Sequence, residues 1–64
     1  MIFQIEGMAC EHCVQAVSDA LHALPIESAK VWIGGADVAF DPLLTSPDQI
    51  REVIEEQGYD CRYD

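Results

Sequence analysis

The spacing of hydrophobic residues changes between strand-like and helix-like along this chain, and that succession most constrains its fold. Phe3 and Ile5 alternate with polar residues within residues 2–6, which predicts a strand. From residue 11 to 24 the apolar residues recur at helical spacing, and Pro25 is expected to stop this helix. The helical set consists of Val14, Val17, Leu21 and Leu24.

Two further strands are predicted in the middle of the chain. Residues 27–33 alternate, with Ala29, Val31 and Ile33 expected on the inner face and Trp32 on the outer face. The pair Gly34-Gly35 then fits a two-residue hairpin turn. Residues 36–40 continue as the third strand, which Asp41-Pro42 closes.

A second helix begins with a clear start signal. Ser46 is expected to be the N-cap, Pro47 the first helical residue, and Gln49 the partner that completes a capping box. Gly58 is the expected end of this helix. Residues 59–63 alternate again and predict a last short strand.

The resulting order, β-α-β-β-α-β, predicts an α+β fold of the ferredoxin-like type. We expect a four-stranded antiparallel sheet with two helices on one face, built as a single domain over residues 1–64. Tracing the chain direction brings three connections to one end of the molecule. They are the loop after the first strand, the glycine turn and the segment 57–59, so a functional site is expected there.

Composition narrows the classes of partner. The chain has 64 residues, half of them hydrophobic, and a formal charge of −9, which disfavours binding to nucleic acid or to an anionic membrane. No apolar run is long enough for membrane insertion, and Met1 leads directly into a strand without a signal-peptide pattern. We therefore expect a cytoplasmic protein, in which the charge aids solubility or steers the chain toward a basic partner.

The chemistry is concentrated in Cys10 and Cys13, which lie where the first strand gives way to the first helix. Thiolates are soft ligands that suit Cu(I), Zn(II) and other thiophilic metals. A helix N-terminus favours the deprotonated form of Cys13, and Gly7 allows the bend that turns Cys10 toward it. Because three cysteines cannot all pair within one chain, the two residues predict a metal clip or a redox pair rather than a disulfide framework.

The neighbours of this pair are expected to have different roles. Met8 is expected to plug the core beneath the loop, and His12 to face solvent at the helix start rather than bind metal. Tyr59 either shields the metal or packs at the end of the sheet. Cys61 is expected to behave as a small buried hydrophobic residue, while His22 lies at the far end of the first helix.

The run Gly-Met-x-Cys-x-x-Cys after a first strand, with the ending at residues 56–60, resembles the heavy-metal-associated domain family, and within it the bacterial copper chaperones of the CopZ type. The resemblance covers essentially the whole chain. It implies a non-enzymatic carrier that binds Cu(I) through Cys10 and Cys13, with Met8 packed below and Tyr59 near the metal. It also implies thiolate exchange with a copper-transporting P-type ATPase and allows a metal-bridged homodimer.

Two features depart from the family pattern, and two other functions stay open. The hairpin is shorter than usual, and Cys61 stands where the family commonly has an aliphatic residue. The clip could instead take zinc, with His12 or Cys61 as added ligands, or mercury, which two thiolates also fit. A Cys-x-x-Cys pair at a helix start is also the arrangement of thiol–disulfide proteins.

Overall fold

A computed structural model describes residues 1–63 of the chain. Its elements follow the predicted order, and the last residue of the predicted domain, Asp64, lies outside the described part. The strands and helices are β1 (Ile2–Glu6), α1 (Glu11–His22), β2 (Ile26–Trp32), β3 (Gly35–Phe40), α2 (Pro47–Glu56) and β4 (Asp60–Tyr63).

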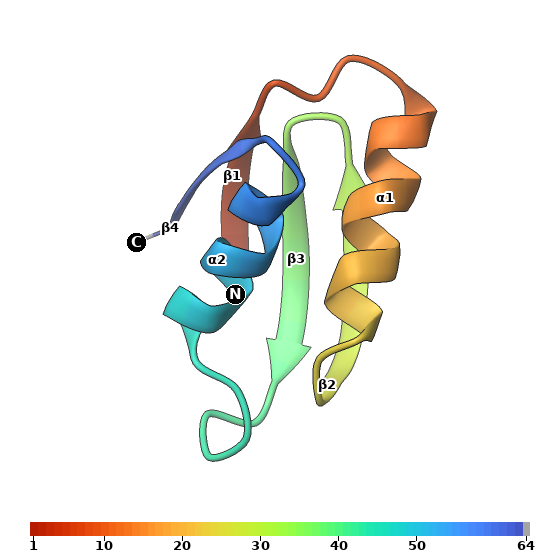
Figure 1. Ribbon diagram of the computed structural model, residues 1–64. Helices are drawn as coiled ribbons and strands as arrows, with labels where there is room; N and C mark the ends of the chain where they lie inside the picture. Colours follow the sequence, from red (N-terminus) through yellow and green to blue (C-terminus); the bar gives the residue numbers. More distant parts are fainter. Residues whose placement is uncertain (64) are drawn as a thin grey trace.

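The four strands form one antiparallel sheet in the order β2-β3-β1-β4, and Figure 1 shows α1 and α2 side by side on one of its faces. Each helix connects strands that are not adjacent, so the two crossovers place the first strand in the middle of the sheet. The predicted ferredoxin-like arrangement is confirmed.

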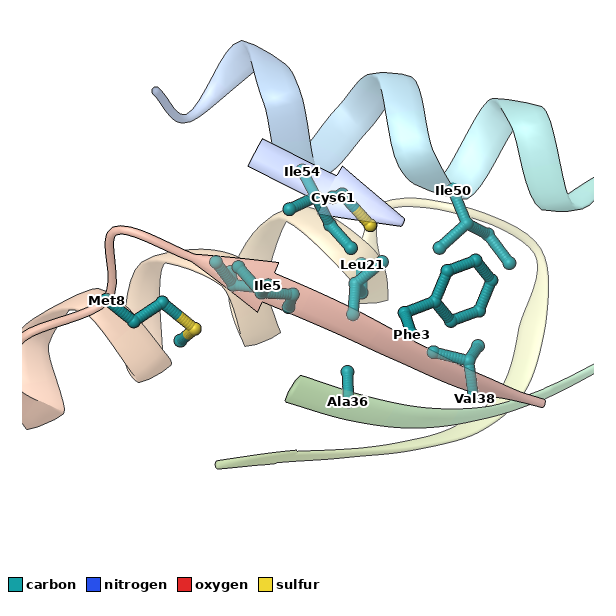
Figure 2. Close-up of a cluster of buried hydrophobic side chains, with 10 residues drawn as sticks. Phe3, Ile5, Met8, Leu21, Ala36, Val38, Ile50, Ile54 and Cys61 are labelled. Atoms are coloured by element: carbon teal, nitrogen blue, oxygen red, sulfur yellow. The ribbon is translucent and has the colours of Figure 1, made fainter. Parts of the chain in front are cut away.

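The core lies between the sheet and the two helices. In β1 only the alternate residues Phe3 and Ile5 point inward, with 0% and 3% of their surface exposed. Phe3 also meets the ring of Tyr63 edge to face, with ring centroids 5.4 Å apart. Figure 2 shows this cluster, whose other buried members are Met8, Val17, Leu21, Ala36, Val38, Ile50, Ile54 and Cys61.

The hairpin turn differs from the prediction by one residue. The turn residues are Ile33 and Gly34, whereas Gly35 is already paired with Trp32 in the β2–β3 ladder. Only Gly34 needs a left-handed backbone, with φ +104°. Gly35 is required for a different reason, since a β-carbon there would lie 2.8 Å from the carbonyl oxygen of Phe3. Ile33, predicted to point inward, is 55% exposed at the tip of the turn.

The element ends differ from the predictions by one or two residues. Helix α1 ends at His22 rather than at Leu24, because Pro25 disfavours a helical conformation for the residue before it. Strand β2 begins and ends one residue earlier than predicted, with a register irregularity between Ile26 and Ser28. Strand β4 begins at Asp60, which leaves Tyr59 in the loop that precedes it.

The second helix follows its start and stop signals. The hydroxyl of Ser46 accepts a hydrogen bond from the backbone N–H of Gln49 at 3.2 Å, which is one half of the predicted capping box, and Pro47 is the first helical residue. At the other end Gly58 has φ +96° and donates its N–H to the carbonyl of Glu55 at 2.9 Å. The chain then turns directly into β4.

Three connections meet at one end of the molecule, as predicted. The backbone N–H of Ile5 donates to the carbonyl of Gly34 at 2.9 Å, so the hairpin turn is fastened to the last residues of β1. Figure 1 shows this turn beside the β1–α1 loop and the α2–β4 connection, at the top of the view. We call this end, formed by residues 7–13, 33–34 and 57–59, the thiol end. Within residues 1–63 no helix has the length and apolar character needed to cross a membrane.

Candidate metal centre

The loop that carries the two thiols reverses direction at Gly7 and becomes helical at Cys10. Gly7 has φ +100°, a conformation that side chains rarely adopt. Cys10 is the N-cap of α1, with an extended backbone at φ −156° and ψ 171°. Its carbonyl accepts the N–H of Cys13 at 3.1 Å, which fixes Cys13 in the first helical turn. The backbone of both cysteines is therefore fixed by the bend and the first helical turn.

The two sulfur atoms are close and accessible. Sγ of Cys10 lies 3.5 Å from Sγ of Cys13, and both residues are free thiols, Cys10 exposed and Cys13 half-buried. A disulfide would require about 2.05 Å. With metal–sulfur bonds of about 2.3 Å, sulfurs at this separation can both ligate one ion in a bent geometry, and an opening of roughly 1 Å would make the geometry linear. The pair can therefore clasp a thiophilic metal with little rearrangement.

The surroundings favour the thiolate form of Cys13. Its pKa is lowered from 9.0 to about 7, first by a hydrogen bond with the side chain of Tyr59, then by the backbone of Ala9 and the thiol of Cys10. Partial burial opposes the shift but is the weaker effect. A thiol with this pKa is about half ionised near neutral pH, so it can bind a metal ion without a large energetic cost for losing its proton.

Tyr59 reaches Cys13 from the α2–β4 connection. The hydrogen bond to Cys13 is also the main reason that the pKa of Tyr59 is raised, so the phenol keeps its proton and acts as the donor. Its ring lies over Gly7, where a β-carbon would come within 3.3 Å of Cδ1 of Tyr59. The predicted location of Tyr59 beside the thiols is found. Its hydrogen bond with Cys13 could not be deduced from the sequence, because the two residues lie far apart in the chain and meet only in the folded structure.

Met8 and His12 occupy the positions expected for residues that surround the clip. Met8 is 8% exposed and belongs to the hydrophobic core, and Figure 2 shows its side chain among the buried residues at the thiol end of the cluster. Its thioether therefore supports the loop from below. His12 is exposed in the first turn of α1. The structure thus brings Cys10, Cys13 and Tyr59 together, with Met8 beneath them.

Three other residues singled out in the sequence lie away from the pair. Cys61 is 4% exposed in β4, as predicted for a buried residue, and its register partner is Ile5. His22 ends α1, where its Nδ1 lies 2.7 Å from the carbonyl of Ser18. Trp32 is 44% exposed, and its indole lies close to Gly35. Among residues 1–63 no three His, Cys, Asp or Glu side chains form a group that could hold a metal.

The sequence matches the heavy-metal-associated domain over residues 2–60. Copper chaperone CopZ of Bacillus subtilis is 43% identical over 60 residues, which cover 89% of this chain and 87% of the relative. The family suggested by the motif at residues 7–13 is therefore confirmed.

Two more comparisons give the range of proteins that share this domain. Copper-transporting ATPase 1 of Mus musculus is 39% identical over 63 residues, which cover 94% of this chain but only 4% of the ATPase. The solved structure of a CopZ metallochaperone superposes with a TM-score of 0.91 at 37% identity and covers 97% of each chain. The same domain thus occurs in a small protein and as a minor part of a large one.

Proposed function

The chain belongs to the heavy-metal-associated domain family, and on that premise we propose that it is a copper metallochaperone that carries Cu(I) on Cys10 and Cys13. The observation that carries the proposal is the accessible thiol pair, with sulfurs 3.5 Å apart. Two soft thiolates suit Cu(I). The lowered pKa of Cys13 supplies a thiolate near neutral pH.

We propose a copper-transporting P-type ATPase as the acceptor, through a metal-binding domain with its own thiol pair. Simple release would be too slow for a carrier. If the dissociation constant were on the order of 10⁻¹⁵ M and capture occurred near ~10⁹ M⁻¹s⁻¹, release would take place at about 10⁻⁶ s⁻¹. Transfer therefore proceeds within a complex of the two proteins.

Each step of the transfer exchanges one copper–sulfur bond for another. A thiolate of the acceptor attacks Cu(I), a new copper–sulfur bond forms, and the bond to Cys10 or Cys13 breaks. The released sulfur leaves as a thiolate and can take a proton from solvent. Copper stays Cu(I) throughout, so no oxidant or reductant is needed. The exposure of Cys10 supports its role as the sulfur that the acceptor approaches first.

Further parts of the proposal concern the setting in which the chain works. We propose that it acts as one domain over residues 1–64, in the cytoplasm and without catalytic activity. The names of the CopZ relatives support a carrier rather than an enzyme. The names of the same relatives favour copper over zinc, mercury or a thiol–disulfide function.

A transfer experiment tests the proposal. The copper-loaded chain is mixed under anaerobic conditions with the soluble metal-binding domain of a copper-transporting P-type ATPase, the two are separated, and copper is measured in each. A parallel sample keeps the proteins apart with a dialysis membrane. We expect rapid transfer only on direct contact. Equal rates in the two samples, or no transfer in either, would contradict the proposal.

A further inference from the structure

The end of the molecule opposite the thiol end carries exposed hydrophobic side chains. Leu43 and Leu44, in the loop between β3 and α2, are 91% and 62% exposed, and Met1 is 39% exposed. Figure 1 shows this loop at the bottom of the view, whereas the thiol end is at the top. We call the surface formed by residues 1, 27, 38–44 and 47 the leucine end. Exposed leucines that stand alone are common on protein surfaces, so a binding site here depends on what surrounds these two.

The loop that carries the leucines is held in one conformation by its hydrogen bonds. The carboxylate of Asp41 accepts the backbone N–H of Leu43 at 2.9 Å, and its carbonyl accepts those of Leu44 and Thr45 at 2.9 and 3.0 Å. Thr45 is only 1% exposed and donates its hydroxyl to the carbonyl of Pro25 at 3.1 Å. The loop is therefore fastened to the start of β2, and Leu43 and Leu44 are held outside the core.

An open cavity of about 370 Å³ lies beside this loop. Its lining is mainly apolar, with Met1, Phe40 and Pro42 among the residues that form it, and Leu43 follows Pro42 directly. Glu27 is the one charged side chain among the lining residues, and within residues 1–63 it forms no ion pair. A fixed apolar surface that continues into a cavity is typical of an interaction site.

Size and charge exclude a second copy of the chain as a stable occupant. The molecule measures 32 Å along its longest axis, which runs between the two ends in Figure 1, and 20 by 17 Å across it. A standard interface buries roughly 800 Å² on each partner, which an end of 20 by 17 Å is too small to supply. Two chains that each carry a formal charge of −9 also repel one another. The occupant is therefore smaller than a folded domain and is not acidic.

We propose that the leucine end docks a short segment of a partner protein that has a leucine-sized apolar side chain next to a lysine or arginine. The apolar side chain fills the cavity, the cation pairs with Glu27, and the rest of the segment covers Leu43 and Leu44. Charge complementarity fixes the orientation of the segment. Because the thiols lie at the opposite end, the segment and a metal ion can be bound at the same time. The proposal goes beyond the copper function and does not depend on it.

The test is an NMR titration of the ¹⁵N-labelled, metal-free chain with three synthetic peptides on a glycine–serine background. One peptide carries two leucines and two lysines, the second has glutamates in place of the lysines, and the third has serines in place of the leucines. We expect the leucine–lysine peptide to shift amide signals of residues 27 and 38–44 but not those of residues 7–13. The other two peptides should bind at least about tenfold more weakly. Equal affinity for all three peptides, or shifts spread over the whole surface, would overturn the proposal.

Matched variants assign the binding to the leucine end. Leu43→Ser/Leu44→Ser should weaken binding of the leucine–lysine peptide at least about tenfold, whereas Ile33→Ser removes a 55% exposed hydrophobic residue at the other end and should change nothing. Glu27→Gln keeps the shape of the cavity and should weaken binding while reducing its salt dependence. An equal loss in the Ile33 variant, or full binding in the double serine variant, would contradict the proposal.

A measurement of Cu(I) affinity separates this docking site from the copper function. The leucine-end variants should bind Cu(I) as tightly as the unmodified chain, with or without the peptide. A chain that binds the peptide but no Cu(I) would contradict only the proposed function. A chain that binds Cu(I) but shows no signal shifts with the leucine–lysine peptide would contradict only the docking site.

Discussion

The ring of Tyr59 packs directly over Gly7: a β-carbon at Gly7 would lie 3.3 Å from Cδ1 of Tyr59. The register explains the contact, because Glu6 and Asp60 are the last pair of the β1–β4 ladder and the next residues on each strand meet beyond it. Tyr59 also lies beside Cys13, where its side-chain hydrogen bond is the main cause of the lowered pKa of that thiol. The bend at Gly7 and the thiol pair therefore share one neighbour, the side chain of Tyr59.

Substitution of Gly7 by alanine should destabilise the chain and disturb Tyr59. The backbone strain at φ +100° should cost about 1–3 kcal/mol in the free energy of unfolding, measured with urea. Gly34→Ala is a matched control, since it has φ +104° but nothing within 4 Å of the added carbon. Both variants should lose stability, but only Gly7→Ala should raise the pKa of Cys13. An unchanged Cys13 pKa in Gly7→Ala would show that the contact does not position the phenol.

Removal of the Tyr59 hydroxyl should raise the pKa of Cys13 directly. In Tyr59→Phe the thiolate loses its strongest hydrogen bond, so the pKa should move from about 7 toward the ordinary value of 9.0. The pH dependence of thiol alkylation measures this shift. Tyr63→Phe is the control, because its hydroxyl bonds to Asp48 on α2 instead. A pKa that moves equally in both variants would point to a general loosening of β4.

The stability of the metal-free chain should rise between pH 7 and pH 9. Cys13 ionises at about 7 when folded and near 9.0 when unfolded, so within this range the unfolded state binds more protons and stability increases with pH. The contribution of the Cys13 thiolate to the free energy of unfolding is lost as the pH falls through 7. Above 9 the trend should reverse, because burial raises the pKa of Cys61. Urea unfolding across this range checks the sign, and Cys13→Ser should remove the rise.

Cys61 should prove to be a structural residue. It is 4% exposed and lies in β4, two residues after Tyr59 in the chain. That spacing places it about 7 Å from the level of the clip, too far for a thiolate bond of about 2.3 Å. Cys61→Val should keep Cu(I) affinity within about tenfold, or ~1.4 kcal/mol. Cys61→Ser should lower the free energy of unfolding by roughly 1–3 kcal/mol, because it buries a hydroxyl without an assured partner. X-ray absorption would contradict this account if a third copper-bound sulfur vanished in Cys61→Val.

The hydrophobic periodicities predicted the fold because each element buries one face against the same core. They also placed the thiol pair at a helix start, since the strand, the bend at Gly7 and the first helical turn are all local features. The hairpin turn was predicted one residue too late, because the sequence does not show which of two adjacent glycines lies in the turn and which in the strand. Gly34 adopts the left-handed backbone conformation that the turn requires, whereas Gly35 leaves room for the neighbouring strand, where a β-carbon would clash. The need for glycine at position 35 comes from Phe3 and Trp32, whose atoms lie against Gly35 only in the folded sheet.

The site was less predictable than the fold for the same reason. The sequence indicated that Tyr59 lies at the correct end, but side-chain packing determines which group its hydroxyl meets. The contact with Gly7 follows from the β1–β4 register, which periodicity alone does not fix. The helix start predicted a lowered pKa for Cys13, whereas the largest cause is a side chain that lies 46 positions further along the sequence.

Anaerobic competition for Cu(I) against a chelator of known affinity tests the central claim most directly. It is carried out on the unmodified chain, Cys10→Ser and Cys13→Ser, with Zn(II) competition in parallel and circular dichroism to check folding. We predict that the unmodified chain binds one Cu(I) tightly and prefers it to Zn(II). Each serine variant should fold but lose this binding, because two thiolates hold the ion. A folded serine variant that still holds Cu(I) against the chelator would contradict the two-thiolate clip.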